Sequence, residues 1–277
     1  MNNLNAKTED LQIHFSYLME NSEEIYRLEQ KTDSNSLQKQ AIWAGLKPGM
    51  RVLDVGCGSG ITTKMLKALV GSKGDVVGID ASAQRIAYAT KNYSDNGVTF
   101  IQKDIYSDMN CLGKFDFIWV RFFLEYHANS AQNIIKFLVN LLSPNGILCL
   151  LDLDNNSNGH FGLSERLQKA INNLLTLLAS KHDFDPYMGR KLYTYMYEAG
   201  LKDIDVQITA HHLIFGPLQK KDLYNWKRKL EVAVSRCGYN FPDYENGFEE
   251  FKEEFLTYLS YPYRFTYTPL ISCCGKK

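Results

Sequence analysis

The stretch RVLDVGCGSG, residues 51–60, has three glycines within five residues, directly after an apolar run and directly before ITTKMLKALV. Glycine adopts positive φ values and has no Cβ, so such a turn lets a ligand lie against the backbone. The helix that follows offers unpaired N–H groups and the positive end of its dipole. The stretch therefore predicts a strand, a ligand-binding turn and a helix, with the ligand at Gly56, Cys57, Gly58 and Gly60.

Short apolar runs and longer amphipathic runs alternate from residue 51 to about residue 153. Strands are expected at 51–55, 75–79, 98–102, 115–120 and 147–153, and helices at 62–70, 83–93 and 131–142. The Ser-Pro-Asn-Gly sequence after residue 142 is expected to end the last of these helices. Near-continuous apolar strands separated by helices are typical of a parallel sheet covered on both faces. We therefore predict a doubly wound, mostly parallel α/β sheet.

The remaining segments are expected to complete a single domain of 277 residues. The prediction begins with a helical leader at residues 1–46 and a cofactor-binding core at 47–154. Two helical insertions, at 155–186 and 217–262, form a substrate cap. A final strand follows at 264–274. Residues 155–162 are polar and read as a loop, whereas residues 201–215 read as a sixth strand.

Two further acids follow the second and third predicted strands. Asp80 ends DVVGID, and a carboxylate at this edge of the sheet can accept both hydroxyls of a ribose. Asp104 follows TFIQ, where it can accept a hydrogen bond from an exocyclic amine such as adenine N6. Ala81 and Ile105 stand beside these acids and could pack on the faces of a purine. The crevice is thus expected to hold a purine nucleoside whose polar tail meets the glycine turn.

The spacing of the glycines and the position of Asp54 indicate what that tail is. A dinucleotide-binding turn has the pattern G-x-G-x-x-G, whereas this turn has G-x-G-x-G. Asp54 lies two residues before the first glycine, where it would repel a pyrophosphate and attract an ammonium group. The pattern favours S-adenosylmethionine (SAM) over a nicotinamide dinucleotide, which makes a dehydrogenase a distant alternative.

The motifs VLDVGCGSG, VVGIDAS, FIQKDI and LSPNGILCLLDLD, in this order, resemble those of the seven-stranded class I SAM-dependent methyltransferases. The leader FSYLMENSEEIYRLEQ is similar to that of small-molecule methyltransferases of the ubiquinone-biosynthesis type. This resemblance implies that Tyr17 and Arg27 close over the methionine moiety and that Arg121, in VRFFLEYHAN, lies on the cofactor side. It also implies that the final strand enters the sheet antiparallel.

One residue is a candidate for acid–base catalysis. His127 follows the fourth predicted strand and would serve as general base for a hydroxyl acceptor, although it could equally pack or cap. No metal site is predicted. His211 and His212 are adjacent in a predicted strand, so their side chains are expected on opposite faces.

The charge balance bears on the acceptor. Lysines and arginines number 31, as do the acids, and a nucleic-acid binder would normally carry a basic excess. The basic run at 220–229 reads as a solvated helix face. We therefore expect a small-molecule acceptor, with a nucleic-acid or protein methyltransferase and a SAM-binding sensor as alternatives.

No membrane span is expected because no window approaches ~18 apolar residues. Six cysteines without metal-site spacing and the lack of a signal-peptide pattern indicate a cytoplasmic protein. The oligomeric state stays open.

Overall fold

The computed structural model describes residues 33–277. Tyr17 and Arg27, the two leader residues predicted to contact the cofactor, lie outside the described residues. The first described helix is α2 (Ser34–Trp43), and the Asp33 carboxylate caps it by accepting a hydrogen bond from the Asn35 N–H. None of the helices in this part of the chain is both long and apolar enough to cross a membrane.

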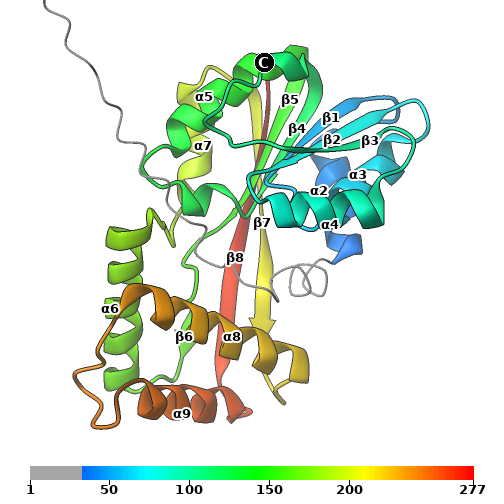
Figure 1. The fold of residues 1–277 in the computed structure, drawn as a ribbon. Helices are drawn as coiled ribbons and strands as arrows, with labels where there is room; N and C mark the ends of the chain where they lie inside the picture. Colours follow the sequence, from blue (N-terminus) through cyan, green and yellow to red (C-terminus); the bar gives the residue numbers. More distant parts are fainter. Residues whose placement is uncertain (1–32) are drawn as a thin grey trace, which may run out of the picture.

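A twisted sheet forms the centre of the molecule (Figure 1). Five parallel strands lie in the order β3-β2-β1-β4-β5. Their bounds are β1 (Arg51–Val55), β2 (Asp75–Asp80), β3 (Val98–Gln102), β4 (Phe115–Arg121) and β5 (Leu142–Leu153). Because the strand order runs outward in both directions from β1, the predicted doubly wound, mostly parallel sheet is confirmed.

Helices cover both faces of this sheet (Figure 1). One face packs against α2 and α3 (Ile61–Val70), around a buried cluster that includes Trp119. The other face packs against α5 (Ala131–Leu141) and α7 (Leu192–Glu198). The helix α4 (Ala83–Tyr93) begins where predicted, and the Ser82 hydroxyl caps it by accepting from the Arg85 N–H.

The start of β5 differs from the prediction. The Ser-Pro-Asn-Gly sequence was expected to separate a helix from a strand, but β5 already begins at Leu142 and includes these residues. Leu142 pairs with Phe115, and the register shifts before Ile147 pairs with Phe117. The backbone of Asn145 takes a φ of 61°, so the turn-forming residues make an irregularity inside the strand.

Three strands from the later part of the chain extend the sheet. The final strand β8 (Phe265–Lys276) runs antiparallel to β5, as predicted, and β7 (Lys202–Ile214) pairs antiparallel with β8. A two-residue strand, β6 (His160–Phe161), pairs with the start of β8. The described sheet has eight strands: the seven that were predicted and β6, which lies in a segment expected to be a loop.

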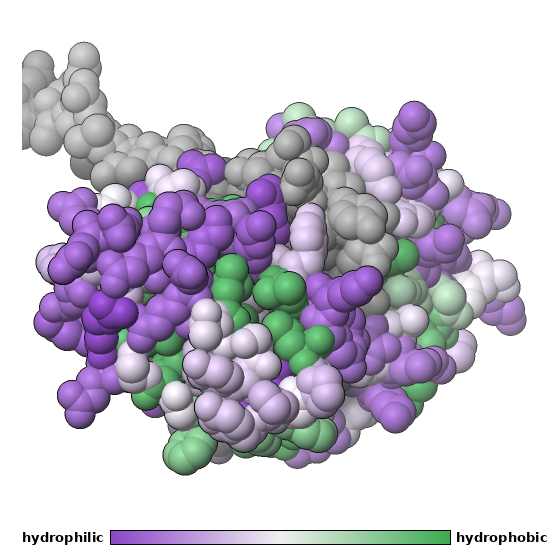
Figure 2. Space-filling view, turned by 90° about the horizontal axis from the view of Figure 1, so that it is seen from below, coloured by the Kyte–Doolittle hydropathy of each residue, from purple (hydrophilic) through white to green (hydrophobic). Residues whose placement is uncertain are grey.

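Beyond the core, β7 and β8 continue toward a second group of helices (Figure 1). These are α6 (Glu165–His182), α8 (Lys220–Cys237) and α9 (Gly247–Ser260), and they enclose their own buried cluster. We call these three helices the cap. Viewed from the cap end, hydrophobic side chains gather in a hollow between hydrophilic ones (Figure 2). Phe161, in β6, and Tyr263, between α9 and β8, are large hydrophobic residues with exposed side chains.

Phe251 is fully buried inside the cap cluster, where its ring contacts those of Phe241 and Phe255. The Phe251→Ala variant is expected to lower the free energy of unfolding by about 3–5 kcal/mol, because it removes a buried ring and leaves a cavity. Urea denaturation followed by circular dichroism measures this change. Phe215→Ala is the control, since Phe215 is 64% exposed and its loss should cost less than about 0.5 kcal/mol. Equal effects of the two variants would contradict the assignment of Phe251 to a packed core.

Candidate functional site

The glycine turn after β1 has the geometry that its sequence predicts. Gly56, Gly58 and Gly60 have φ values of 69°, 55° and 87°, all in the left-handed region. A Cβ on Gly56 would lie 2.6 Å from the ring of Phe123, and one on Gly60 would lie 2.8 Å from Phe100. Gly56 and Gly60 are therefore required by packing within the protein, because a larger side chain at either position would clash. Cys57 is buried within the turn, and burial raises the pKa of its thiol.

The start of α3 is open to an anionic group. Gly60 is its N-cap residue, so no side chain caps the N–H groups of the first turn. The preceding Ser59 hydroxyl is 1% exposed and has no hydrogen-bond partner within residues 33–277. A buried hydroxyl without a partner marks a place where a ligand or a water can complete the hydrogen bonding.

Asp54 is a buried carboxyl at the carboxyl end of β1. Its Oδ2 accepts a hydrogen bond of 2.6 Å from the Thr63 hydroxyl, and its side chain is almost fully enclosed. Burial raises the pKa of Asp54 to about 7, the Thr63 bond opposes this shift, and the nearby charge of Asp80 adds to it. Burial also lowers the pKa of Arg121 to about 10, and the charge of Asp54 opposes that change. The Asp54 carboxyl and the Arg121 guanidinium therefore interact electrostatically beside the glycine turn.

Asp80 fastens the turn to the end of β2. Its Oδ2 accepts from the Gly58 N–H at 3.0 Å, and its Oδ1 accepts from the Ser82 N–H at 2.9 Å. The Arg85 Nε lies 3.3 Å from the same Oδ1. A carboxylate can accept about four hydrogen bonds, so Asp80 keeps acceptor capacity for a diol.

The residues predicted to hold a purine lie in different environments. Asp104 is half-buried, and its Oδ1 accepts from the Tyr106 N–H at 3.0 Å. Ala81 is exposed at the end of β2, whereas Ile105 is 7% exposed and packs in the cluster beneath α5. Asp104 and Ala81 are thus accessible, while most of the Ile105 side chain is committed to the core.

His127 joins two loops of the crevice. Its Nδ1 lies 2.8 Å from the Tyr106 hydroxyl, which is also 2.6 Å from the Ser130 hydroxyl. The imidazole packs on Phe123, the residue that touches Gly56, with ring centroids 4.4 Å apart. Burial lowers the pKa of His127 to about 4, so the ring is neutral near pH 7 and a weak base.

A pair of buried acids lies near the carboxyl ends of β4 and β5. The backbone N–H of Glu125 donates to Asp152 Oδ2, and the two side chains are 2% and 1% exposed. Burial, together with the charge of Glu125, raises the pKa of Asp152 well above its ordinary value. The Asn156 amide donates to Glu125 Oε2 at 2.6 Å and accepts from Lys229 Nζ at 2.5 Å. This chain of hydrogen bonds connects the end of β4 to helix α8 of the cap.

The prediction that His211 and His212 point to opposite faces is wrong. The register of β7 against β8 shifts between Ala210 and His212, which places one extra residue in the strand. As a result the two imidazole centroids are only 4.3 Å apart. Within residues 33–277, no group of three His, Cys, Asp or Glu side chains could hold a metal ion.

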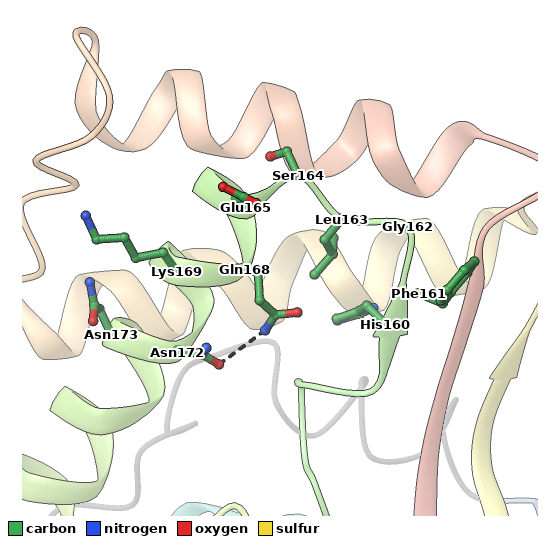
Figure 3. A pocket seen from close by; sticks show the side chains of 10 residues that line it. All are labelled: His160, Phe161, Gly162, Leu163, Ser164, Glu165, Gln168, Lys169, Asn172 and Asn173. Carbon is green, nitrogen blue, oxygen red and sulfur yellow. Dashed lines mark hydrogen bonds between the residues drawn. The ribbon is translucent and has the colours of Figure 1, made fainter.

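The cap contains a pocket of about 560 Å³ between β6 and α6. Figure 3 shows His160 on one wall and Gln168 of α6 on the facing wall, with their side chains directed toward one another. The amides of Asn172 and Asn173 also line this pocket. Its lining is therefore mixed, with one imidazole, several amides, apolar side chains and the oppositely charged Glu165 and Lys169.

Sequence reasoning did not single out Trp226 and Lys229 of α8, which face the interior of the protein. Trp226 is 3% exposed, and the Lys229 ammonium lies 5.0 Å from the centroid of its ring. Residues three apart lie on the same face of a helix, so their spacing was a usable signal. The basic composition of residues 220–229 had instead been interpreted as a solvated helix face, and Lys220, Lys221 and Lys227 are indeed exposed.

Residues 46–201 match a family described as a methyltransferase domain. The chain belongs to this family. It is a class I SAM-dependent methyltransferase, and S-adenosylmethionine is its cofactor. The crevice fits that cofactor, since Ser59 and the first turn of α3 leave hydrogen-bonding groups open and acids end β1 and β2.

Curated relatives of this methyltransferase differ in their acceptors. Ubiquinone biosynthesis O-methyltransferase of Burkholderia pseudomallei is 26% identical over 178 residues, which cover 63% of this chain and 72% of that protein. Juvenile hormone acid O-methyltransferase of Bombyx mori is 26% identical over 220 residues, covering 72% and 75%. Ribosomal protein L11 methyltransferase of Thermosipho africanus is 32% identical over 108 residues, and this match spans only 38% of the chain and 40% of that protein.

Solved structures share the fold of this methyltransferase. A cyclopropane-fatty-acyl-phospholipid synthase-like protein from Lactobacillus casei aligns with a TM-score of 0.57 and 14% identity, over 92% of this chain and 94% of that one. Haemonchus contortus phosphoethanolamine N-methyltransferase 2, in complex with SAM, aligns with a TM-score of 0.56 and 16% identity, over 91% and 56%. Because the sequence identities are only 14% and 16%, these two alignments establish a shared fold.

The raised pKa of Asp54 predicts how this methyltransferase responds to pH. Because the folded pKa of about 7 exceeds the ordinary value of 3.8, the contribution of Asp54 to stability is complete below about pH 4 and is lost as the pH rises through 7. The stability of the wild type relative to Asp54→Asn should therefore fall between about pH 4 and pH 7 and stay level above that, as measured by urea denaturation. A constant difference between wild type and Asp54→Asn would contradict the assignment.

Proposed function

We propose that this enzyme transfers the methyl group of SAM to a small-molecule acceptor bound between the crevice and the cap. The observation that carries the proposal is the position of the cap: α8 is connected through Lys229, Asn156 and Glu125 to the turn that follows β4. An acceptor held under this connection would lie next to the crevice. The names of the Burkholderia and Bombyx relatives, which specify ubiquinone biosynthesis and juvenile hormone acid, support a small acceptor.

In this proposal the donor is held by the residues around the glycine turn. The open N–H groups of α3 and the Ser59 hydroxyl suit a carboxylate, and Asp54 suits an ammonium group. Asp80 has acceptor capacity left for the ribose hydroxyls, and Asp104 would accept from the adenine amine. Arg121 would lie beside the methionine moiety. When bound, SAM supplies an activated methyl group, so the main task of the protein is alignment and exclusion of water.

The contacts and the lowered pKa of His127 indicate a positioning role for this residue. Its Nδ1 is engaged with Tyr106 and its ring rests on Phe123, so it holds the loops after β3 and β4 together. A neutral imidazole with a pKa of about 4 is a weak acceptor of protons. An acceptor that arrives already deprotonated would need no base, and we assign His127 first to positioning.

The principal alternative is a macromolecular acceptor, which the ribosomal protein L11 methyltransferase match favours. Incubation of the enzyme with methyl-labelled SAM and either a metabolite extract or a ribosomal protein fraction separates the two. We expect label in products below about 1 kDa, identified by mass spectrometry. Label confined to protein or RNA would refute the small-molecule assignment. SAM binding without any labelled product would instead indicate a sensor.

Asp80→Ala tests the donor site. Loss of the carboxylate removes two acceptor oxygens and leaves the Gly58 and Ser82 N–H groups without their partner. Hydrogen bonds to charged groups contribute about 1.5–3 kcal/mol each, so affinity for S-adenosylhomocysteine should fall roughly 10- to 100-fold in calorimetry. Asp75→Ala, on the same strand but at its other end, should bind normally. Unchanged affinity in Asp80→Ala would show that the ribose is bound elsewhere.

A further inference from the structure

A row of aromatic rings leads from the end of β4 into the cap. Phe122 contacts His211 with ring centroids 4.7 Å apart, and His211 contacts His212 at 4.3 Å. His212 lies 5.8 Å from Trp226 of α8, and Trp226 lies 5.0 Å from His160 of β6. We call these five residues the ring row. The bulge in β7 makes the row continuous, because it brings both imidazoles together.

The ring row begins at the cofactor crevice. The guanidinium carbon of Arg121 lies 4.2 Å from the ring centroid of Phe122. Burial lowers the pKa of Arg121, and the charge of Asp54, in the crevice, acts to raise it. At its other end, His160 forms part of the wall of the pocket seen in Figure 3. A molecule lying along the row could therefore reach from the crevice into the cap.

Three buried polar atoms on or beside the ring row lack hydrogen-bond partners among the described residues, and one of them is Nε2 of His160. The Trp226 Nε1–H belongs to a side chain that is 3% exposed, and the Thr268 hydroxyl belongs to one that is 1% exposed. Thr268 is the register partner of His212, so the two side chains share one face of the sheet. Buried polar groups usually find a partner in the protein, a water or a ligand, so unpartnered atoms along one row favour a ligand site there.

The chemistry of these atoms indicates which ligand fits. The indole N–H donates only, the Lys229 ammonium beside it donates only, and the Thr268 hydroxyl can donate as well. Burial and the charge of Lys229 lower the pKa of His160 to about 4, so His160 is neutral and Lys229 provides the positive charge. Donors combined with a cation and aromatic rings match an oxygen-rich anion attached to a ring or another apolar body.

We infer that the ring row binds the methyl acceptor, and that this acceptor carries an anionic oxygen group, a carboxylate or a phosphate, which Trp226 and Lys229 recognise. The inference rests on the proposed function and specifies its substrate class. The indole N–H and the ammonium would hold the anionic group, while Phe122, His211 and His212 would pack against the body of the acceptor. The pocket of about 560 Å³ beside His160 leaves room for a longer substituent.

Four probes that share one aromatic ring test the charge preference: phenylacetate, phenyl phosphate, phenethylamine and 2-phenylethanol. Each is titrated against the full-length protein, with and without S-adenosylhomocysteine, and followed by NMR. We expect one or both anions to bind at least about tenfold more tightly than the amine and the alcohol. Preference for phenylacetate would identify a carboxylate acceptor, and preference for phenyl phosphate a phosphorylated one. Equal affinity for all four probes, or preference for the amine, would overturn the inference.

Trp226→Phe and Lys229→Met show where the anion binds. The first keeps a ring and removes the N–H donor, and the second keeps much of the side-chain volume and removes the charge. Each should weaken anion binding about tenfold and leave S-adenosylhomocysteine affinity unchanged. Lys227→Met, an exposed position on the same helix, is the control for charge alone. Undiminished anion binding in both site variants would overturn the assignment to the ring row.

The outcomes separate this inference from the proposed function. Tight S-adenosylhomocysteine binding without an anion preference would overturn the ring-row inference and leave the donor site intact. An anion preference lost in Trp226→Phe, in a protein that does not bind S-adenosylhomocysteine, would uphold the ring row as an anion site and overturn the proposed transfer reaction.

Discussion

The hydrogen bond from the Gly58 N–H to the Asp80 carboxylate is the contact on which the crevice depends. It joins the turn after β1 to the end of β2, and the same carboxylate accepts from Ser82 at the start of α4. One side chain thereby fixes the separation of two strand ends. The glycines of the turn are then constrained from both sides, because Phe123 and Phe100 occupy the space that a Cβ would need. The turn is therefore rigid before any ligand arrives.

Most of the core could be predicted from the sequence because its signals are local. The alternation of apolar strands and amphipathic helices follows from which faces are buried, and the strands β1 and β3 have the predicted bounds. Asp54 and Asp80 could be assigned to the crevice because the carboxyl ends of parallel strands meet at one edge of the sheet. The same reasoning placed Ile105 only approximately, since it gave its position along the chain and not the direction of its side chain.

The cap and its connection to the core depend on contacts that the local sequence does not encode. The strand β6 exists because His160 and Phe161 pair with the start of β8, more than 100 residues away. Likewise, Ser143–Gly146 has the composition of a turn, yet pairing of Leu142 with Phe115 holds the segment in the sheet. The adjacency of His211 and His212 results from a register shift, which alternation alone cannot predict.

The groups proposed to contact the two ligands differ in charge, although Arg121 lies near Asp54 and Glu125 is linked to Lys229 through Asn156. Asp54 and Asp80 are buried on the donor side, where SAM would place its cationic groups. Lys229 and the Trp226 N–H stand on the inferred acceptor side. Asp54, Asp80 and Trp226 are buried, so each would interact with its ligand more strongly than at the surface. A chain of zero formal net charge can thus favour a cationic donor and an anionic acceptor together, because different side chains would contact each of them. The post-β4 turn, which carries Phe122, Phe123 and Glu125, is the element that contacts both sides.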